Sequence, residues 1–144
     1  MNDKKVTIIV PCYNVAQTLP RFLDSVLNQT HHNIQIIAVN DGSKDNTAEI
    51  LQAYNTKFLK KGMELLYIYQ ENQGLGGAIN TGLKHIKGDF LCWADPDDFY
   101  MDTSIQERLE ILVTHNEYDI VSSDAYYYMN SDLTMPIQKA TDGL

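Results

Sequence analysis

Three carboxylates lie within four positions of one another: Asp95, Asp97 and Asp98 directly follow an apolar run. Carboxylates this close repel one another unless a cation or a shared proton relieves the repulsion. Hard oxygen ligands of this kind suit Mg²⁺ or Mn²⁺, which keep their other coordination positions for water and phosphate oxygens. The alternative is an ordinary turn, because Asp-Pro is typical of turns and Asp98 can cap a following segment. The spacing therefore predicts either a divalent metal site or a turn.

A second acidic turn, Asp41-Gly42-Ser43, follows another apolar run. A short acceptor side chain here suits the N–H of a nucleobase or the hydroxyl of a ribose. The alternative is again structural, because Ser43, Asp45 and Asn46 also suit the start of a helix. Two acidic turns at the ends of strands in one sheet are placed to hold the two ends of a nucleoside diphosphate.

Apolar patterning predicts the elements that position these turns. Short apolar runs predict strands at residues 6–10, 34–39, 65–69, 90–94 and 120–122. Between them, apolar residues at helical spacing predict helices whose buried faces fall within residues 19–27, 50–58, 78–86 and 105–113. Strict alternation of strands and helices favours one α/β domain over residues 1–144, with a mostly parallel sheet in a three-layer α/β/α arrangement. Ligands of such sheets bind beyond the carboxyl ends of the strands, where both acidic turns lie.

Composition excludes several other classes of protein. The 144 residues carry 11 Lys and Arg against 19 Asp and Glu, a net charge of −8 that disfavours nucleic acid as a partner. The four His and two Cys residues lack zinc-ligand spacing. The chain shows neither a signal-peptide pattern nor an apolar stretch of about 20 residues, which predicts a cytoplasmic location and no transmembrane segment.

The sequence also lacks two known phosphate-binding motifs. The Gly74-Leu75-Gly76-Gly77 segment lacks the third glycine of a dinucleotide fingerprint, because Ile79 stands there, and Leu83 replaces the lysine that a P-loop needs. Phosphoryl-transfer proteins of the flavodoxin-like or haloacid-dehalogenase-like kind place an Asp after the first strand. This chain has residues 11–14, Pro-Cys-Tyr-Asn, at that point.

Taken together, several segments resemble a known family. They are Val6 to Asn14, Val39 to Thr47, Glu71 to Leu75, Asn80 to Gly82, Lys87 to Asp89 and Asp95 to Asp98. In this order they resemble the inverting glycosyltransferases of family 2, which have the GT-A fold, over essentially the first 100 residues. The joint pattern is specific to that family, although no single segment is.

This resemblance implies a nucleotide-sugar donor, usually with UDP, and transfer of a hexose to an acceptor hydroxyl with inversion. The implied nucleotide-binding residues are Pro11, Tyr13, Asn14, Asp41, Asn72, Gly74 and Asp95. Among them, Asp41 is expected near the uracil and Asp95 near the ribose or the metal. Asp97 is expected, with Asp95, to coordinate Mn²⁺ or Mg²⁺ in a D-x-D motif. The family's acceptors are carbohydrates or lipid-linked sugars, which implies cell-surface polysaccharide or glycolipid synthesis, peripheral at the inner membrane face.

Two features depart from the family pattern. Many relatives carry Arg at the position of Ile79, so any donor contact made by that Arg is absent. Only 47 residues follow Asp97 (144 − 97), whereas the family's catalytic base usually lies well beyond the D-x-D motif. Asp124 is the best-placed substitute base among the Asp residues of the last third.

These departures shape the expected organisation of the chain. We expect residues 1–100 to form the donor-binding half and residues 101–144 the start of the acceptor-binding part, with the fold incomplete at the C-terminus. The alternative function is a nucleotide-sugar-binding module that transfers nothing because it lacks the base. An open sheet edge near residues 120–128 predicts self-association into a homo-oligomer.

Overall fold

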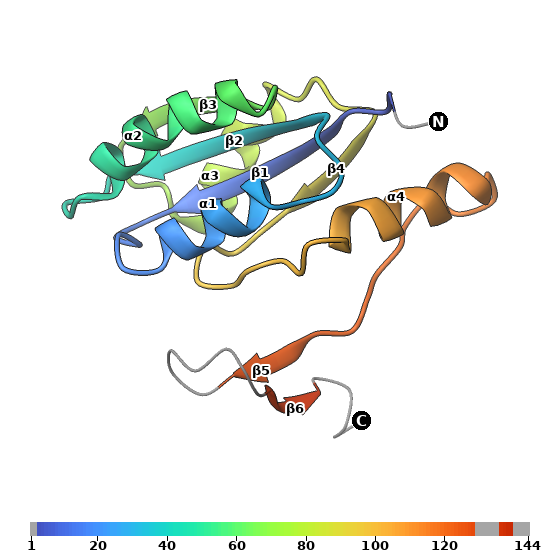
Figure 1. The fold of residues 1–144 in the computed structure, drawn as a ribbon. Coiled ribbons are helices and arrows are strands. Elements are labelled where there is room, and N and C mark those ends of the chain that lie inside the picture. Colours follow the sequence, from blue (N-terminus) through green and yellow to red (C-terminus); the bar gives the residue numbers. More distant parts are fainter. Residues whose placement is uncertain (1–2, 129–135, 140–144) are drawn as a thin grey trace. The chain divides into compact units, whose positions relative to one another are not determined.

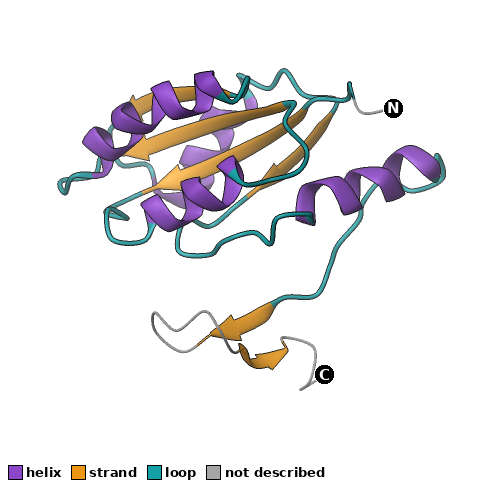
Figure 2. Ribbon diagram, viewed as in Figure 1, coloured by secondary structure: helices purple, strands orange, loops and turns teal. Residues whose placement is uncertain are grey.

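The core of the computed structural model is a parallel β-sheet covered by helices on both faces (Figures 1 and 2). The structure describes residues 3–128 and 136–139. Four strands form the sheet in the order β3-β2-β1-β4: β1 (Val6–Cys12), β2 (Ile34–Asp41), β3 (Glu64–Gln70) and β4 (Phe90–Trp93). Between these strands lie α1 (Leu19–Leu27), α2 (Thr47–Lys60) and α3 (Gly74–Leu83). The predicted α/β alternation and parallel sheet are confirmed over these elements.

Apolar β-branched residues account for the position of the central strands. Every residue of β1 and β2 is buried, and the two strands pair in register, with Ile9 beside Ile37. Such continuous apolar runs are typical of parallel strands that are covered on both faces. The α1 and α2 helices cover one face of the sheet and α3 covers the other (Figure 1).

The helix α3 packs closely on its face because it is rich in small residues. Gly82 lies directly against Ile9, where a Cβ atom would come within 2.6 Å of the Ile9 side chain. Ala78 joins the same apolar cluster, which includes Ile37 and Val39. The helix ends at Leu83, earlier than the apolar pattern predicts.

On the opposite face, α1 and α2 are joined by a side-chain contact. The Tyr54 hydroxyl of α2 donates a hydrogen bond to Asp24 Oδ1 of α1 at 2.9 Å. Burial and this bond, together with the charge of Asp24, raise the pKa of Tyr54 to about 12. The α2 helix ends at Lys60, and Gly62 follows the C-cap residue Lys61 with a positive φ of 72°.

The chain divides into two compact units, residues 1–106 and 107–144. The helix α4 (Ser104–Thr114) begins in the first unit, and the second contains β5 (Tyr126–Tyr128) and β6 (Pro136–Lys139). These two strands pair antiparallel in a separate two-stranded sheet. The predicted fifth strand at residues 120–122 is wrong, because residues 120–125 are neither helix nor strand. Ile120 is 85% exposed, so its apolar side chain lacks the buried face that a strand needs.

The predicted open edge at residues 120–128 is therefore partly paired, since Tyr126–Tyr128 contact β6. Within the described part of the chain, the outer strands of the parallel sheet, β3 and β4, each keep one unpaired edge. Self-association stays a prediction. Within the described residues, none of the helices combines the length and the apolar character that a membrane span requires.

Candidate functional site

The loops that follow the parallel strands gather at one edge of the sheet and enclose a pocket of about 300 Å³. The pocket receives side chains from the ends of β1 and β2 and from the start of α3. Its lining residues are Pro11, Cys12, Tyr13, Asp41, Asn72, Gly74, Leu75 and Ala78. Five residues predicted to bind nucleotide, Pro11, Tyr13, Asp41, Asn72 and Gly74, are among them. This is the expected place for a ligand in a parallel α/β sheet.

Asp41, the last residue of β2, is the pocket's carboxylate and is only 3% exposed. Its Oδ1 atom accepts hydrogen bonds from Gln70 Nε2 at 2.6 Å and from the backbone N–H of Gln73 at 2.8 Å. A buried carboxylate needs such partners, because the loss of hydration is costly otherwise. Two donors therefore fix its position at the wall of the pocket.

The turn after β1 is tied to the turn after β2 by Asn14. Its backbone N–H donates to Ser43 Oγ at 3.0 Å, and its Oδ1 accepts from the backbone N–H of Lys44 at 2.8 Å. Asn14 holds a φ of 53°, in the left-handed region that Asn tolerates better than most residues. The structure thus places Asn14 between two loops rather than in the pocket lining.

Cys12 is a pocket residue that sequence reasoning did not select. Its thiol donates to the backbone carbonyl of Val10 at 3.4 Å. Burial, with a smaller contribution from the charge of Asp45, raises the pKa of Cys12 to about 12. The thiol therefore stays protonated near neutral pH and serves as an apolar wall, not as a nucleophile.

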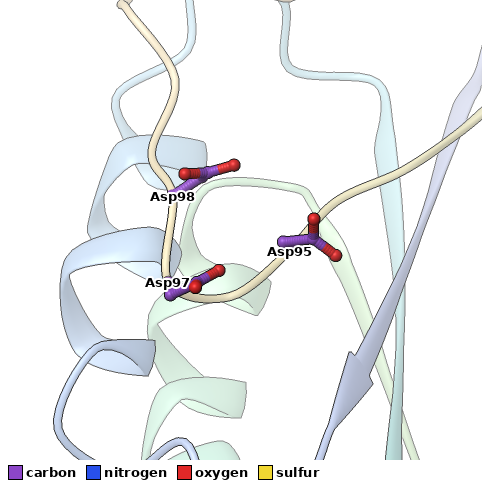
Figure 3. A group of neighbouring side chains, drawn as sticks. All are labelled: Asp95, Asp97 and Asp98. Carbon is purple, nitrogen blue, oxygen red and sulfur yellow. The ribbon is translucent and has the colours of Figure 1, made fainter. Parts of the chain in front are cut away.

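The acidic turn lies after β4, and its three carboxyl groups are neighbours (Figure 3). Each of Asp95, Asp97 and Asp98 offers a carboxylate oxygen, and these oxygens lie within 4.8 Å of one another. All three residues are exposed. Partial burial, followed by the charges of Asp97 and Asp95, raises the pKa of Asp98, whereas Arg21 opposes that shift. The predicted grouping of Asp95 with Asp97 is thus present in the geometry, and Asp98 belongs to the same cluster.

Arg21 of α1 contacts the backbone of the acidic turn. Its Nη2 atom donates to the backbone carbonyl of Asp97, and its guanidinium lies 5.3 Å from the centre of the Phe99 ring. The backbone N–H of Asp98 also donates to the carbonyl of Asp95 at 3.1 Å. The turn is therefore held through its backbone, which leaves the carboxylates directed outward.

Two buried polar residues of the α1 region hold the segment after the acidic turn. Ser25 Oγ accepts from the backbone N–H of Tyr100 at 3.0 Å. Gln29 Nε2 donates to the carbonyl of Met101 at 2.8 Å, and Gln29 Oε1 accepts from the N–H of Ile105 at 3.0 Å. Sequence reasoning missed these anchors. The available signal was two polar residues four apart, Ser25 among the apolar residues of α1 and Gln29 just beyond its end.

The remaining predicted residue, Asp124, lies in the second unit. Its carboxylate forms an ion pair with Lys139 of β6. Its role as a substitute base stays a prediction.

Comparison with known proteins assigns this α/β chain to a family. The sequence model of the family described as "Glycosyl transferase family 2" matches residues 7–141. An uncharacterized glycosyltransferase of Rickettsia typhi is 40% identical over 116 residues, which cover 81% of this chain and 34% of that protein. Glycosyltransferase GlyA of Streptococcus pneumoniae is 38% identical over 135 residues, or 89% of this chain and 19% of that protein. The chain belongs to glycosyltransferase family 2.

Solved structures show the same fold. Residues 1–349 of Staphylococcus aureus TarS, in a crystal structure with UDP, are similar with a TM-score of 0.71 and 26% sequence identity. The match covers 78% of this chain and 33% of the TarS chain. It confirms the GT-A class of α/β fold. The chain spans about a third or less of the length of these proteins.

Proposed function

We propose that this chain binds a nucleoside diphosphate sugar, with UDP as the nucleotide, as the donor half of an inverting glycosyltransferase. The acceptor is the hydroxyl of a carbohydrate or of a lipid-linked sugar, and the pathway is cell-surface polysaccharide or glycolipid synthesis. One observation carries the proposal: five residues expected to bind nucleotide line a single pocket around a buried carboxylate. The complexes of TarS with UDP and with UDP-GlcNAc support the choice of donor.

The residues that line the pocket can make different kinds of contact with a base. Pro11 and Tyr13 offer apolar and aromatic surface on which a base can lie, and Asp41 offers a carboxylate oxygen to an N–H of that base. The pocket volume of about 300 Å³ is at the small end of the range for ligand sites and suits a single heterocycle.

The acidic turn fits a divalent ion. Oxygen ligands of a hexacoordinate Mg²⁺ lie up to about 4.2 Å apart. The carboxylate oxygens of Asp95 and Asp97 lie within 4.8 Å, so small rotations of these exposed side chains bring them to one ion. When bound there, Mn²⁺ or Mg²⁺ neutralises the charge that develops on the diphosphate leaving group. Arg21 holds the backbone at Asp97, and the hydrogen bond from the Asp98 N–H to the Asp95 carbonyl closes the turn between the two aspartates.

A thermal-shift experiment tests the nucleotide and metal sites together. UDP should raise the melting temperature more with Mn²⁺ than with EDTA, because a ligand that binds only the folded state stabilises it. Asp97→Ala should abolish the difference between Mn²⁺ and EDTA. Glu49→Gln, which removes one exposed charge on α2, is the matched control and should leave the difference unchanged. A metal effect that persists in Asp97→Ala would refute the D-x-D assignment.

A second candidate function is nucleotide-sugar binding without transfer. It is favoured because Asp41, the one carboxylate among the residues that line the described pocket, already accepts two hydrogen bonds and is committed to binding. Inverting transfer needs a carboxylate that removes the acceptor's proton, and Asp124 is the proposed group. UDP release that rises with added acceptor and falls in Asp124→Asn would support transfer. UDP binding without any release would support the binding module.

A further inference from the structure

A chain of hydrogen bonds runs from α3 through β3 to the base pocket. Thr81 Oγ1 of α3 donates to Gln70 Oε1 at 2.5 Å. The other end of the same amide, Gln70 Nε2, donates to Asp41 Oδ1 at 2.6 Å. Thr81 and Gln70 are not among the residues that line the pocket, so both act on it through Asp41.

The direction of this chain is set by its chemistry. An amide has a donor end and an acceptor end, and the Thr81 hydroxyl occupies the acceptor end of Gln70. The amide must therefore turn its N–H group toward Asp41. The backbone N–H of Gln73 approaches the same Oδ1 atom, so two donors occupy that oxygen. Within the described residues, Asp41 Oδ2 accepts no hydrogen bond and remains for a ligand.

An acceptor held in this way discriminates between bases. Uracil presents an N–H at N3, and guanine presents one at N1. Cytosine and adenine present a bare ring nitrogen at the corresponding position, which repels a carboxylate. We propose that Gln70 and Thr81 are positioning residues that keep Asp41 an acceptor, so that the pocket selects a base with a ring N–H. This inference rests on the proposed nucleotide site and deepens it.

The substitution Gln70→Glu separates this role from packing. The new side chain has nearly the same shape and still accepts from Thr81, but it places a carboxylate oxygen against Asp41. Two carboxylates at hydrogen-bond distance share one proton. The shared proton lies on the Oδ1 side of Asp41, so the negative charge on Oδ2 falls. Oδ2 then accepts less strongly from the uracil N–H and repels the bare nitrogen of cytosine less. We expect the preference for UDP over CDP to fall at least about tenfold.

The measurement is the ratio of the dissociation constants for UDP and CDP, both taken with the same Mn²⁺ concentration. The contributions of the diphosphate and metal cancel in that ratio, whereas a purely structural defect weakens both ligands alike. Gln52→Glu, on the exposed side of α2, adds the same charge elsewhere and should keep the wild-type ratio. If Gln70→Glu does not fold, Thr81→Val removes only the first donor and should lower the ratio a few-fold.

The outcomes distinguish the inference from the proposed function. A folded Gln70→Glu variant that keeps the wild-type ratio would overturn the positioning role of Gln70 and Thr81 and leave nucleotide binding intact. A wild-type chain that binds UDP and CDP equally would do the same. A wild-type chain that binds neither nucleotide would overturn the proposed function, and with it the positioning role of Gln70 and Thr81.

Discussion

Replacing Asp98 by Asn should stabilise the metal-free chain and weaken its response to divalent ions. In the absence of an ion, Asp98 faces the carboxylates of Asp95 and Asp97. The raised pKa of Asp98 means that its charged form is disfavoured in the folded state. A carboxyl group with a raised folded pKa contributes stability at pH values below its unfolded pKa, and that contribution is lost as the pH rises through the folded pKa. The stabilising effect of Asn should therefore appear near neutral pH and vanish in acid.

The geometry sets the size of this effect. Two unit charges 4.8 Å apart repel by about 0.9 kcal/mol in water. Asp98 takes part in two such pairs, but salt screening and the nearby Arg21 offset part of the repulsion. We expect Asp98→Asn to raise the free energy of unfolding by about 1 kcal/mol, which corresponds to about 4 °C in melting temperature for a chain of this size.

Thermal unfolding at pH 7 in EDTA, and again with Mn²⁺ or Mg²⁺, measures both halves of the prediction. The variant should melt above the wild type in EDTA, and the ion should add less stability to it than to the wild type. Asp119→Asn removes an exposed carboxylate outside the cluster and should change neither value. An Asp98→Asn chain that is no more stable than the wild type in EDTA would show that the three carboxylates do not repel one another as their geometry implies.

Three further predictions concern the scaffold. Gly82→Ala should cost about 1–3 kcal/mol in unfolding free energy, because its Cβ would come within 2.6 Å of Ile9. Gly76→Ala in the same helix meets nothing within 4 Å and should stabilise the chain by up to about 1 kcal/mol; chemical denaturation compares the two. Tyr54→Phe should flatten the loss of stability between pH 10 and about 12, because the unfolded Tyr54 ionises at lower pH than the folded one. Cys12 should resist alkylation at pH 8 until the chain is unfolded, as a mass-spectrometric time course would show.

Apolar patterning in the sequence predicts the strands whose formation depends mainly on their own residues. The β1 and β2 strands are rich in apolar, β-branched residues, and a run of this kind has few alternatives to a buried parallel strand. Residues 120–122 show the limit of the method. They begin with two apolar β-branched residues, Ile120 and Val121, but a strand also requires a partner and a covered face, and Ile120 is 85% exposed.

The sequence likewise predicts some features of the candidate site and not others. Asp41 ends β2 and the acidic cluster comes just after β4, so their place at the carboxyl ends of the strands follows from the alternation of elements. Gln70 and Thr81 are eleven residues apart on different elements, and their contact depends on how α3 crosses back over the sheet. Gln29 likewise contacts Met101, a residue 72 positions away. Such contacts depend on tertiary packing, and no periodicity in the sequence encodes them.

The two ends of the proposed site are stabilised by opposite means. Asp41 is buried, and its loss of hydration is offset by donors within the protein, so its position is fixed in the free chain. The acidic cluster is exposed and retains its mutual repulsion, and Arg21 holds it only through the backbone carbonyl of Asp97. Under the proposed function, base selection therefore depends on bonds that already exist in the free chain. Affinity for the diphosphate depends on a cation that relieves the cluster's repulsion. Substitutions at Gln70 should change which nucleotide binds at any ion concentration, whereas substitutions at Asp97 or Asp98 should change how strongly every nucleoside diphosphate binds, and only when the ion is present.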